Sequence, residues 1–298
     1  MRIASLDLGS NTFLMLIADF QDGKFQSVVR DELTTTRLGQ GVHANRKFHP
    51  EALERADECF SRYAKIIEEV KPDKVIAMAT SAARDVSNGE DLFKLGEKYG
   101  IPIRIIPGEK EAQISFEGST FEHKEDKGLA VIDVGGGSTE VIAKDSTGKL
   151  VGKSLDIGSV RLTELFGEDI EKLEDYCDKI ISECRDELIQ EPIKKLVAVA
   201  GTPVTISLII QESDYIHEKV HGYEFSLEQL RELRSKLAEM PLEKRKAIKG
   251  MDPKRADVIV AGTTILLKTA QALAAENILV SNHGVRYGIA HLAARGEC

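Results

Sequence analysis

The strongest constraint on the fold of this chain is that one segment of it occurs twice. The segments IASLDLGSNTFLMLIAD (3–19) and LAVIDVGGGSTEVIAKD (129–145) each contain an apolar strand, an aspartate, a glycine-bearing turn with a hydroxyl, and a second strand. The alignment pairs Asp7 with Asp133, Gly9 with Gly135, and Thr12 with Ser138. Since internal repetition indicates repeated structural units, the chain is predicted to hold two domains of similar architecture.

The repeat extends beyond these two hairpins. In each half a third predicted strand runs into a glycine-bearing turn, a long helical segment follows, and two further strands each lead through a turn into a helix. The matching segments are the turns 37–41 and 155–161, the helices 50–70 and 171–190, and the strand-turn segments 74–85 and 195–206, then 103–112 and 277–288. Each half therefore reads β-β-β-α-β-α-β-α, which predicts mixed sheets with helices on their faces.

Length and local composition also fit two domains. A chain of 298 residues exceeds a typical single domain and suits two domains of about 100–200 residues each. The polar segment 118–128 is the expected linker. Segment 207–257 departs from the repeat and is expected to be a helical insertion, with Ser226 as the N-cap of one of its helices.

Composition narrows the class of partner. The net charge is −9, so a global basic field for nucleic acid is absent. The sequence contains no run of eighteen apolar residues, so no membrane span is expected. The N-terminus lacks the pattern of a signal peptide. The four cysteines form no C-x-x-C pair and are expected as buried thiols, which suits a reducing compartment. We therefore expect a cytoplasmic protein without nucleic-acid or membrane partners.

The glycine hairpins are candidate phosphate-binding elements. Glycine in such a turn lets backbone N–H groups approach an anion closely, and three consecutive glycines usually mark a turn or close ligand approach. For either glycine hairpin alone, an ordinary hairpin turn without a ligand is the alternative. Because the hairpin occurs twice, each time after an aspartate at the strand end, we favour phosphate binding. The candidate residues are Gly9, Ser10, Asn11, Thr12, Gly135, Gly136, Gly137 and Ser138.

The two aspartates that end the equivalent strands are candidate metal ligands. Asp7 and Asp133 would face each other across a cleft if the halves pack about a pseudo-twofold axis. Two carboxylates in that arrangement suit a hard cation that keeps water in its shell. We expect Mg²⁺, with Mn²⁺ as an alternative. Taken singly, either aspartate is equally a turn or capping residue.

Five segments carry a family resemblance that covers nearly the whole chain. They are DLGSNTF (7–13), ATSAARD (79–85), PGEKEA (107–112), DVGGGSTE (133–140) and SNHGVRYG (281–288). In this order they resemble the Ppx/GppA phosphatases, within the acetate and sugar kinase, Hsc70 and actin superfamily. The resemblance implies two ribonuclease-H-like domains, 1–120 with 286–298 and 121–285, with the active site in the cleft between them.

The resemblance also implies roles for three side chains. Glu111 is the general base, and the alternative is an acid in the first turn of a helix. Glu140 binds metal or positions water, and the alternative is a surface residue on an edge strand. Arg84 stabilises charge on the transferring phosphate, and the alternative is a surface pair with Asp85. Arg286 is a weaker candidate, with an ion pair between the domains as its alternative.

Two other features are weaker. The histidines show no nucleophile-base arrangement and are interpreted as surface or capping residues; His217 and His221 are spaced i, i+4. Lys110 and Gln113 stand where family members more often carry an acid and an arginine, which leaves substrate preference open.

The activity implied is hydrolysis of phosphoanhydrides. Inorganic polyphosphate and guanosine pentaphosphate are the expected substrates, without a preference between them, and a homodimer is left open. One rival is an ATP-dependent kinase of the same superfamily, since the AGTP turn at 200–203 fits either class. The other is a non-catalytic protein that binds guanosine tetraphosphate, against which Glu111 and Glu140 argue.

Overall fold

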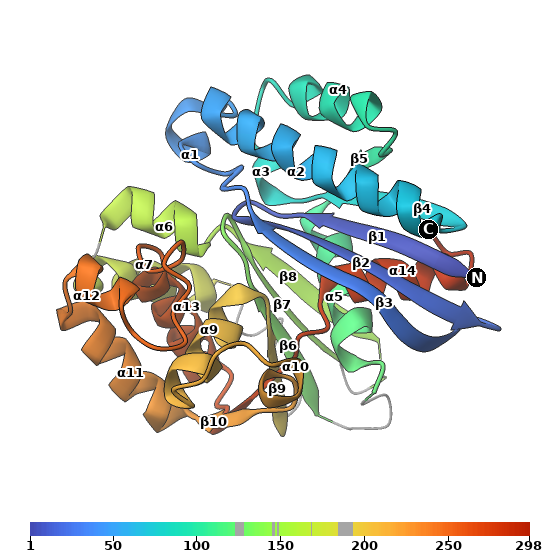
Figure 1. Cartoon of the computed structure of the whole chain (residues 1–298). Helices are drawn as coiled ribbons and strands as arrows, with labels where there is room; N and C mark the ends of the chain where they lie inside the picture. The colour runs from blue at the N-terminus through green and yellow to red at the C-terminus, as the bar shows by residue number, and fades with distance from the viewer. Residues whose placement is uncertain (123–127, 145–146, 148, 168, 184–192) are drawn as a thin grey trace. The chain divides into compact units, whose positions relative to one another are not determined.

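The chain forms two compact units (Figure 1), seen here in a computed structural model. The structure describes residues 1–298 except 123–127, 145–146, 148, 168 and 184–192. Unit 1 comprises Met1–Gly118 and Val285–Cys298, and unit 2 comprises Ser119–Gly284.

Unit 1 is built on a five-stranded sheet in the order β3-β2-β1-β4-β5. The strands are β1 (Arg2–Leu8), β2 (Thr12–Gln21), β3 (Lys24–Thr35), β4 (Lys74–Ala79) and β5 (Ile103–Ile105). The first three strands form an antiparallel meander, while β4 pairs parallel to β1 and β5 parallel to β4. The sheet is therefore mixed, because hairpins join the early strands and helices join the later ones.

Helices cover both faces of this sheet (Figure 1). They are α1 (Val42–Asn45), α2 (Pro50–Val70), α3 (Ser81–Arg84), α4 (Glu90–Lys98), α5 (Gly108–Thr120) and α14 (Val285–Ala294). Alternate residues of β1 serve the two faces. Leu6 and Leu8 share a core with Phe60 of α2, whereas the Ser5 hydroxyl donates to the carbonyl of Arg286 in α14 at 2.7 Å.

Unit 2 is built on a six-stranded sheet in the order β10-β11-β9-β6-β7-β8. The strands are β6 (Leu129–Val134), β7 (Thr139–Lys144), β8 (Leu150–Leu155), β9 (Lys195–Val199), β10 (Glu224–Ser226) and β11 (Asn277–Val280). Again the first three strands form an antiparallel meander, and β9 runs parallel to β6 and β11 parallel to β9. The short strand β10 adds an antiparallel edge.

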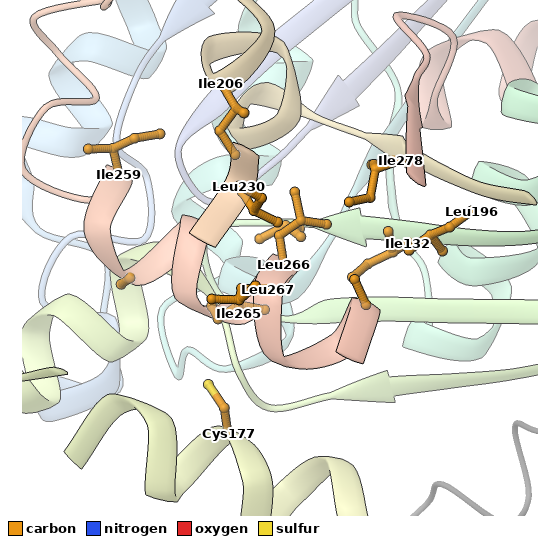
Figure 2. Close-up of a cluster of buried hydrophobic side chains, with 14 of the residues drawn as sticks. Ile132, Cys177, Leu196, Ile206, Leu230, Ile259, Ile265, Leu266, Leu267 and Ile278 are labelled. Atoms are coloured by element: carbon orange, nitrogen blue, oxygen red, sulfur yellow. The ribbon is translucent and has the colours of Figure 1, made fainter. Parts of the chain in front are cut away.

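The core of unit 2 gathers around one helix, α13 (Ile259–Ala272). Figure 2 shows its side chains among residues of α7 (Ile170–Ser182), α11 (Leu227–Glu239) and three strands. The remaining described helices are α6 (Ser159–Phe166), α9 (Gly201–Ile210), α10 (His217–Val220) and α12 (Leu242–Lys246). Because α13 is buried nearly all round, most of its residues are apolar or small, and the buried hydroxyls of Thr263 and Thr264 donate to carbonyls of the preceding turn.

The expected fold class is confirmed in both units. The predicted helix 50–70 coincides with α2, and Ser226 caps α11 in a capping box with Gln229. The insertion is helical as expected, except that it also supplies the unpredicted strand β10. Part of the predicted helix 171–190 lies outside the described residues, and α7 ends at Ser182.

Two smaller expectations have mixed outcomes. Cys59 and Cys177 are buried thiols, as expected, and burial raises the pKa of Cys177 to about 12. Cys298 is exposed, so the expectation is wrong there, and Cys184 lies outside the described residues. Among the helices that the structure describes, none has the length and apolar character needed to cross a membrane.

The close approach of α14 to α5 within unit 1 gives a stability prediction. A Cβ at Gly288 would lie 1.9 Å from the carbonyl oxygen of Ile114, so Gly288→Ala forces the helices apart. Overpacking of this kind costs about 2–3 kcal/mol, more than the roughly 1 kcal/mol gained in helix propensity. Urea unfolding is expected to show a net loss. Gly89→Ala is the control, because its nearest neighbours lie at 3.9 Å; equal stability of the two variants would contradict the prediction.

Candidate functional site

The two repeated hairpins close with the same hydrogen bond. The N–H of Gly9 donates to the carbonyl of Thr12 at 3.1 Å, and the N–H of Gly135 donates to the carbonyl of Ser138 at 3.0 Å. A Cβ at either glycine would lie within 2.9 Å of that carbonyl oxygen. The glycines are therefore required by the tightness of the turn, and the sequence alignment holds at the level of single atoms.

A second glycine turn supports each hairpin. The N–H of Gly39 donates to the carbonyl of Ser10 at 2.7 Å. In unit 2 a Cβ at Gly158 would lie 2.4 Å from the carbonyl oxygen of Gly136, which also accepts the N–H of Arg161 at 3.0 Å. The carbonyl groups at the hairpin tips are thus bonded inward, which fixes the direction of the peptide planes.

The hairpin tips present donors suited to phosphate. Within the described part of the chain, the N–H groups of Ser10, Asn11, Gly136 and Gly137 donate to no backbone carbonyl. The Nδ2 of Asn11 is buried and likewise has no partner among the described residues. By contrast, the amides of Gly9 and Gly135 are used by the hairpins themselves. The arrangement suits an anion with several oxygens.

Two buried carboxylates face each other in the hairpin of unit 2. Asp133 of β6 and Glu140 of β7 are directly paired across the ladder, so their side chains share one face of the sheet. They are 8% and 0% exposed. Glu140 also accepts the Ser154 hydroxyl at 2.6 Å. Glu140 lies on an interior strand, so the interpretation as an edge-strand surface residue is wrong.

The equivalent position of unit 1 carries one carboxylate. Asp7 is paired with Leu14 in the β1–β2 ladder, as Asp133 is with Glu140, and it is partly exposed. Like charges directly opposite on neighbouring strands are destabilising, and a buried carboxylate needs a hydrogen bond, a counter-charge or a metal. The residues of unit 2 therefore fit a hard divalent cation. That Asp7 and Asp133 face each other stays a prediction.

The buried Glu111 forms an ion pair with the partly buried Arg84 in unit 1. Glu111 lies in the first turn of α5, and Arg84 ends α3 after strand β4. Arg84 Nη1 donates to Glu111 Oε2 at 2.7 Å and to the carbonyl of Ile106 at 2.9 Å. The Glu111 side chain is 9% exposed. The alternative of an Arg84–Asp85 surface pair is wrong, since Asp85 lies 3.8 Å from Arg46 instead.

Two other arginines have defined positions. Arg286 of α14 makes a two-pronged pair with Asp31 of β3, at 2.8 and 2.9 Å. Both residues belong to unit 1, so this pair lies within one unit and is not a pair between the domains. Arg255, which the sequence did not single out, packs over the AGTP turn: a Cβ at Gly201 would lie 2.0 Å from its guanidinium.

The histidines of unit 2 are not scattered over the surface. His221 and His283 lie beside Glu122. His283 is buried, so its interpretation as a surface residue is wrong, whereas His221 is the C-cap residue of α10. The i, i+4 spacing of His217 and His221 was visible in the sequence, but the partners Glu122 and His283 come from distant segments. His123 lies outside the described residues.

Comparison with known proteins gives consistent matches. The model of the Ppx/GppA phosphatase family matches residues 16–293. The chain is 32% identical to exopolyphosphatase 2 of Mycobacterium tuberculosis, over 97% of both chains. It is 34% identical to the bifunctional 3-dehydroquinate synthase/phosphatase of Fusobacterium nucleatum, with 94% of this chain and 45% of that protein covered. The chain therefore spans less than half of that relative.

A solved structure supports the same assignment of fold. The Ppx/GppA family member of Aquifex aeolicus is 30% identical, has a TM-score of 0.81, and covers 100% of this chain with 98% of its own. The expectation of the actin-like, ribonuclease-H-like fold is confirmed by this match.

The buried ion pair gives a prediction about stability. Arg84→Met removes the cation from beside the Glu111 carboxylate, so the free energy of unfolding is expected to fall by about 3 kcal/mol. Glu111→Gln keeps an oxygen acceptor for Arg84 and is expected to cost less. Denaturant unfolding measures both. Arg46→Met, at an exposed arginine, is the control and should change stability by less than about 1 kcal/mol; an equal loss in Arg46→Met would contradict the assignment.

Proposed function

The chain belongs to the Ppx/GppA phosphatase family, and from this premise we propose that it hydrolyses terminal phosphoanhydride bonds of inorganic polyphosphate, of guanosine pentaphosphate, or of both. The observation that carries the proposal is the buried Glu111 held by Arg84 at the start of α5. The relative of matching length is an exopolyphosphatase, which favours polyphosphate as the principal substrate. Phosphate release from guanosine pentaphosphate, giving the tetraphosphate, is the second activity of the same site.

Glu111 is the proposed general base. Its ion pair with Arg84 fixes the direction of the carboxylate, as a base must be fixed relative to the water that it activates. Glu111 accepts a proton from water, the water oxygen bonds to the terminal phosphorus, and the bridging P–O bond breaks. Orthophosphate and a chain shorter by one phosphate are the products.

Arg84 is also proposed to bind phosphate oxygens. It lies next to the base, and a guanidinium matches phosphate geometry and stabilises developing charge. The hairpin tips add their backbone amides and the hydroxyls of Ser10, Thr12 and Ser138. Each of these three residues is at most 8% exposed. Hydrogen-bond donors fixed by the hairpins need no reorganisation when charge develops, which is how such groups lower a barrier.

Mg²⁺ is the proposed cofactor. Asp133 and Glu140 would hold it in unit 2, and Asp7 joins them in the proposal because it has the equivalent position in unit 1. When bound, the ion neutralises phosphate oxygens. The facing carboxylates, which repel each other otherwise, support a hard cation with oxygen ligands.

The rival functions predict different behaviour. A kinase needs room for adenosine at the AGTP turn, but the guanidinium of Arg255 packs directly over Gly201. Phosphate release from polyphosphate without any acceptor would exclude the kinase. A binding protein would hold guanosine tetraphosphate while hydrolysing neither substrate. Assays of the purified protein on both substrates, with Mg²⁺ and with a chelator, separate these cases.

Substitution of the base is the direct test. Glu111→Gln is expected to keep the fold and to lower turnover by about 10²–10⁴-fold, because the amide cannot accept the proton. Initial rates of phosphate release measure the effect. Glu109→Gln, at an exposed acid of the same helical turn, is the matched control and should remain within a few-fold of wild type. Near-wild-type turnover in Glu111→Gln would remove Glu111 as base.

The proposed Mg²⁺ site can be tested by its effect on stability, without an activity assay. Mg²⁺ at about 100 times its Kd is expected to stabilise the wild type by about 2.7 kcal/mol, seen as a rise in Tm. In Glu140→Gln the rise should shrink, while the metal-free variant gains stability because one of the two facing charges is gone. Thermal unfolding with Mg²⁺ and with a chelator measures both effects. Equal stabilisation of the variant and the wild type by Mg²⁺ would place the ion elsewhere.

A further inference from the structure

Three side chains of unit 2, apart from the proposed phosphatase residues, place metal-ligand atoms close together. One ligand atom each from Glu122, His221 and His283 lies within 4.8 Å of the other two. His221 Nε2 lies 2.9 Å from Glu122 Oε2, and His283 Nδ1 lies 3.7 Å from the same oxygen. The three residues come from segments far apart in the sequence, so the fold itself assembles them.

The backbone fixes both histidines to the end of strand β11. The N–H of Gly222, directly after His221, donates to the carbonyl of Val280 at 2.9 Å, and the N–H of Val280 donates to the carbonyl of Tyr223 at 2.8 Å. The N–H of His283 donates to the hydroxyl of Ser281 at 3.1 Å. The relative position of the two imidazoles is thus set by strand pairing, which is the support that a precise ligand set requires.

Ring contacts hold the imidazoles further. The rings of His221 and His283 stack with centroids 4.1 Å apart, and Phe121 stacks on His283 at 5.3 Å. Exposure rises across the cluster, from 8% for the His283 side chain to 22% for His221 and 44% for Glu122. The cluster is therefore closed on the His283 side and open to solvent on the Glu122 side, which gives an ion a path of entry.

We propose that Glu122, His221 and His283 form a binding site for a divalent transition-metal ion of the Zn²⁺ type. Two imidazoles and one carboxylate are a ligand set that suits Zn²⁺ and its neighbours, and three protein ligands leave a position for water. Mg²⁺ prefers oxygen ligands alone. The site is chemically different from the carboxylates Asp133 and Glu140, and it does not depend on the proposed phosphatase activity.

The hydrogen bonds of the metal-free cluster show which proton and which hydrogen bond a bound ion would replace. The N–H of Asn282 donates to His221 Nδ1 at 3.3 Å, so Nε2 carries the ring proton and donates it to Glu122. Metal binding at Nε2 displaces that proton and requires the Asn282 bond to open. That bond is longer than the usual range for an N–H donor, so its loss opposes metal binding only weakly.

The position of the site in the chain suggests what the ion does. Glu122 follows shortly after Gly118, and His283 directly precedes Gly284; these are the points where the chain passes between the two units. An ion shared by Glu122 and His283 would join the ends of both connecting segments within unit 2. Its role would be to stabilise unit 2 at these ends.

Cobalt titration is the experiment, with Mg²⁺ in large excess so that oxygen-rich sites are filled. One Co²⁺ per chain is expected to bind with visible absorption bands typical of nitrogen ligation, and Zn²⁺ should displace it. His221→Phe should abolish the bands, and Glu122→Gln should weaken binding by about 10-fold or more. His49→Ala, at an exposed histidine of unit 1, should bind Co²⁺ as the wild type does.

Thermal unfolding guards against misfolded variants and gives a second readout. Zn²⁺ at about 100 times its Kd should favour the folded wild type roughly 100-fold, and the gain should disappear in folded His221→Phe. If His221→Phe does not fold, the test relies on Glu122→Gln, because Glu122 is exposed and its substitution leaves the core intact. A folded variant that binds Co²⁺ with wild-type affinity and spectrum would overturn the proposal, as would a wild-type protein without nitrogen-ligated Co²⁺.

Discussion

Much of this structure depends on one backbone hydrogen bond, which is made once in each unit. In it, the N–H of a glycine donates to the carbonyl of the residue three positions later in the chain. The bond forces a tight reversal directly after the first strand, so that the aspartate lies one residue before the end of that strand. A side chain at Gly9 or Gly135 would collide with the accepting carbonyl. The glycine of this repeated pattern is therefore a consequence of backbone geometry before it is a consequence of chemistry.

The two hairpins share a backbone but differ in charge. Opposite Asp133 stands Glu140, whereas opposite Asp7 stands Leu14. The facing pair in unit 2 is unfavourable by itself, so the fold tolerates it only with compensation from neighbours such as Ser154 or from a bound cation. Unit 1 instead carries the partly buried Glu111–Arg84 pair, whose charges offset each other. The two hairpins thus share one backbone frame, and the residue opposite the aspartate gives each of them a different charge.

Local patterns predicted the elements that local physics determines. The helix 50–70 follows from apolar spacing and a proline at its start, and the equivalence of Asp7 with Asp133 follows from the repeat. The partner of Arg84 could not be predicted, because Glu111 meets it only after β4 and β5 pair. The same holds for His221 with His283, which strand β10 brings together although it is too short to show a period of its own.

The two metal sites proposed for unit 2 have different ligand chemistry on one sheet. The β6–β7 hairpin presents carboxylate oxygens, and the end of β11 presents imidazole nitrogens beside one carboxylate. Ligand type separates the metals that each set prefers, so an ion of one class would not compete strongly for the other set. Strands β6 and β11 are separated by β9 in the sheet, and rigid strand pairing keeps the sets apart. The proposed catalytic cation and the proposed second, softer ion would therefore bind independently.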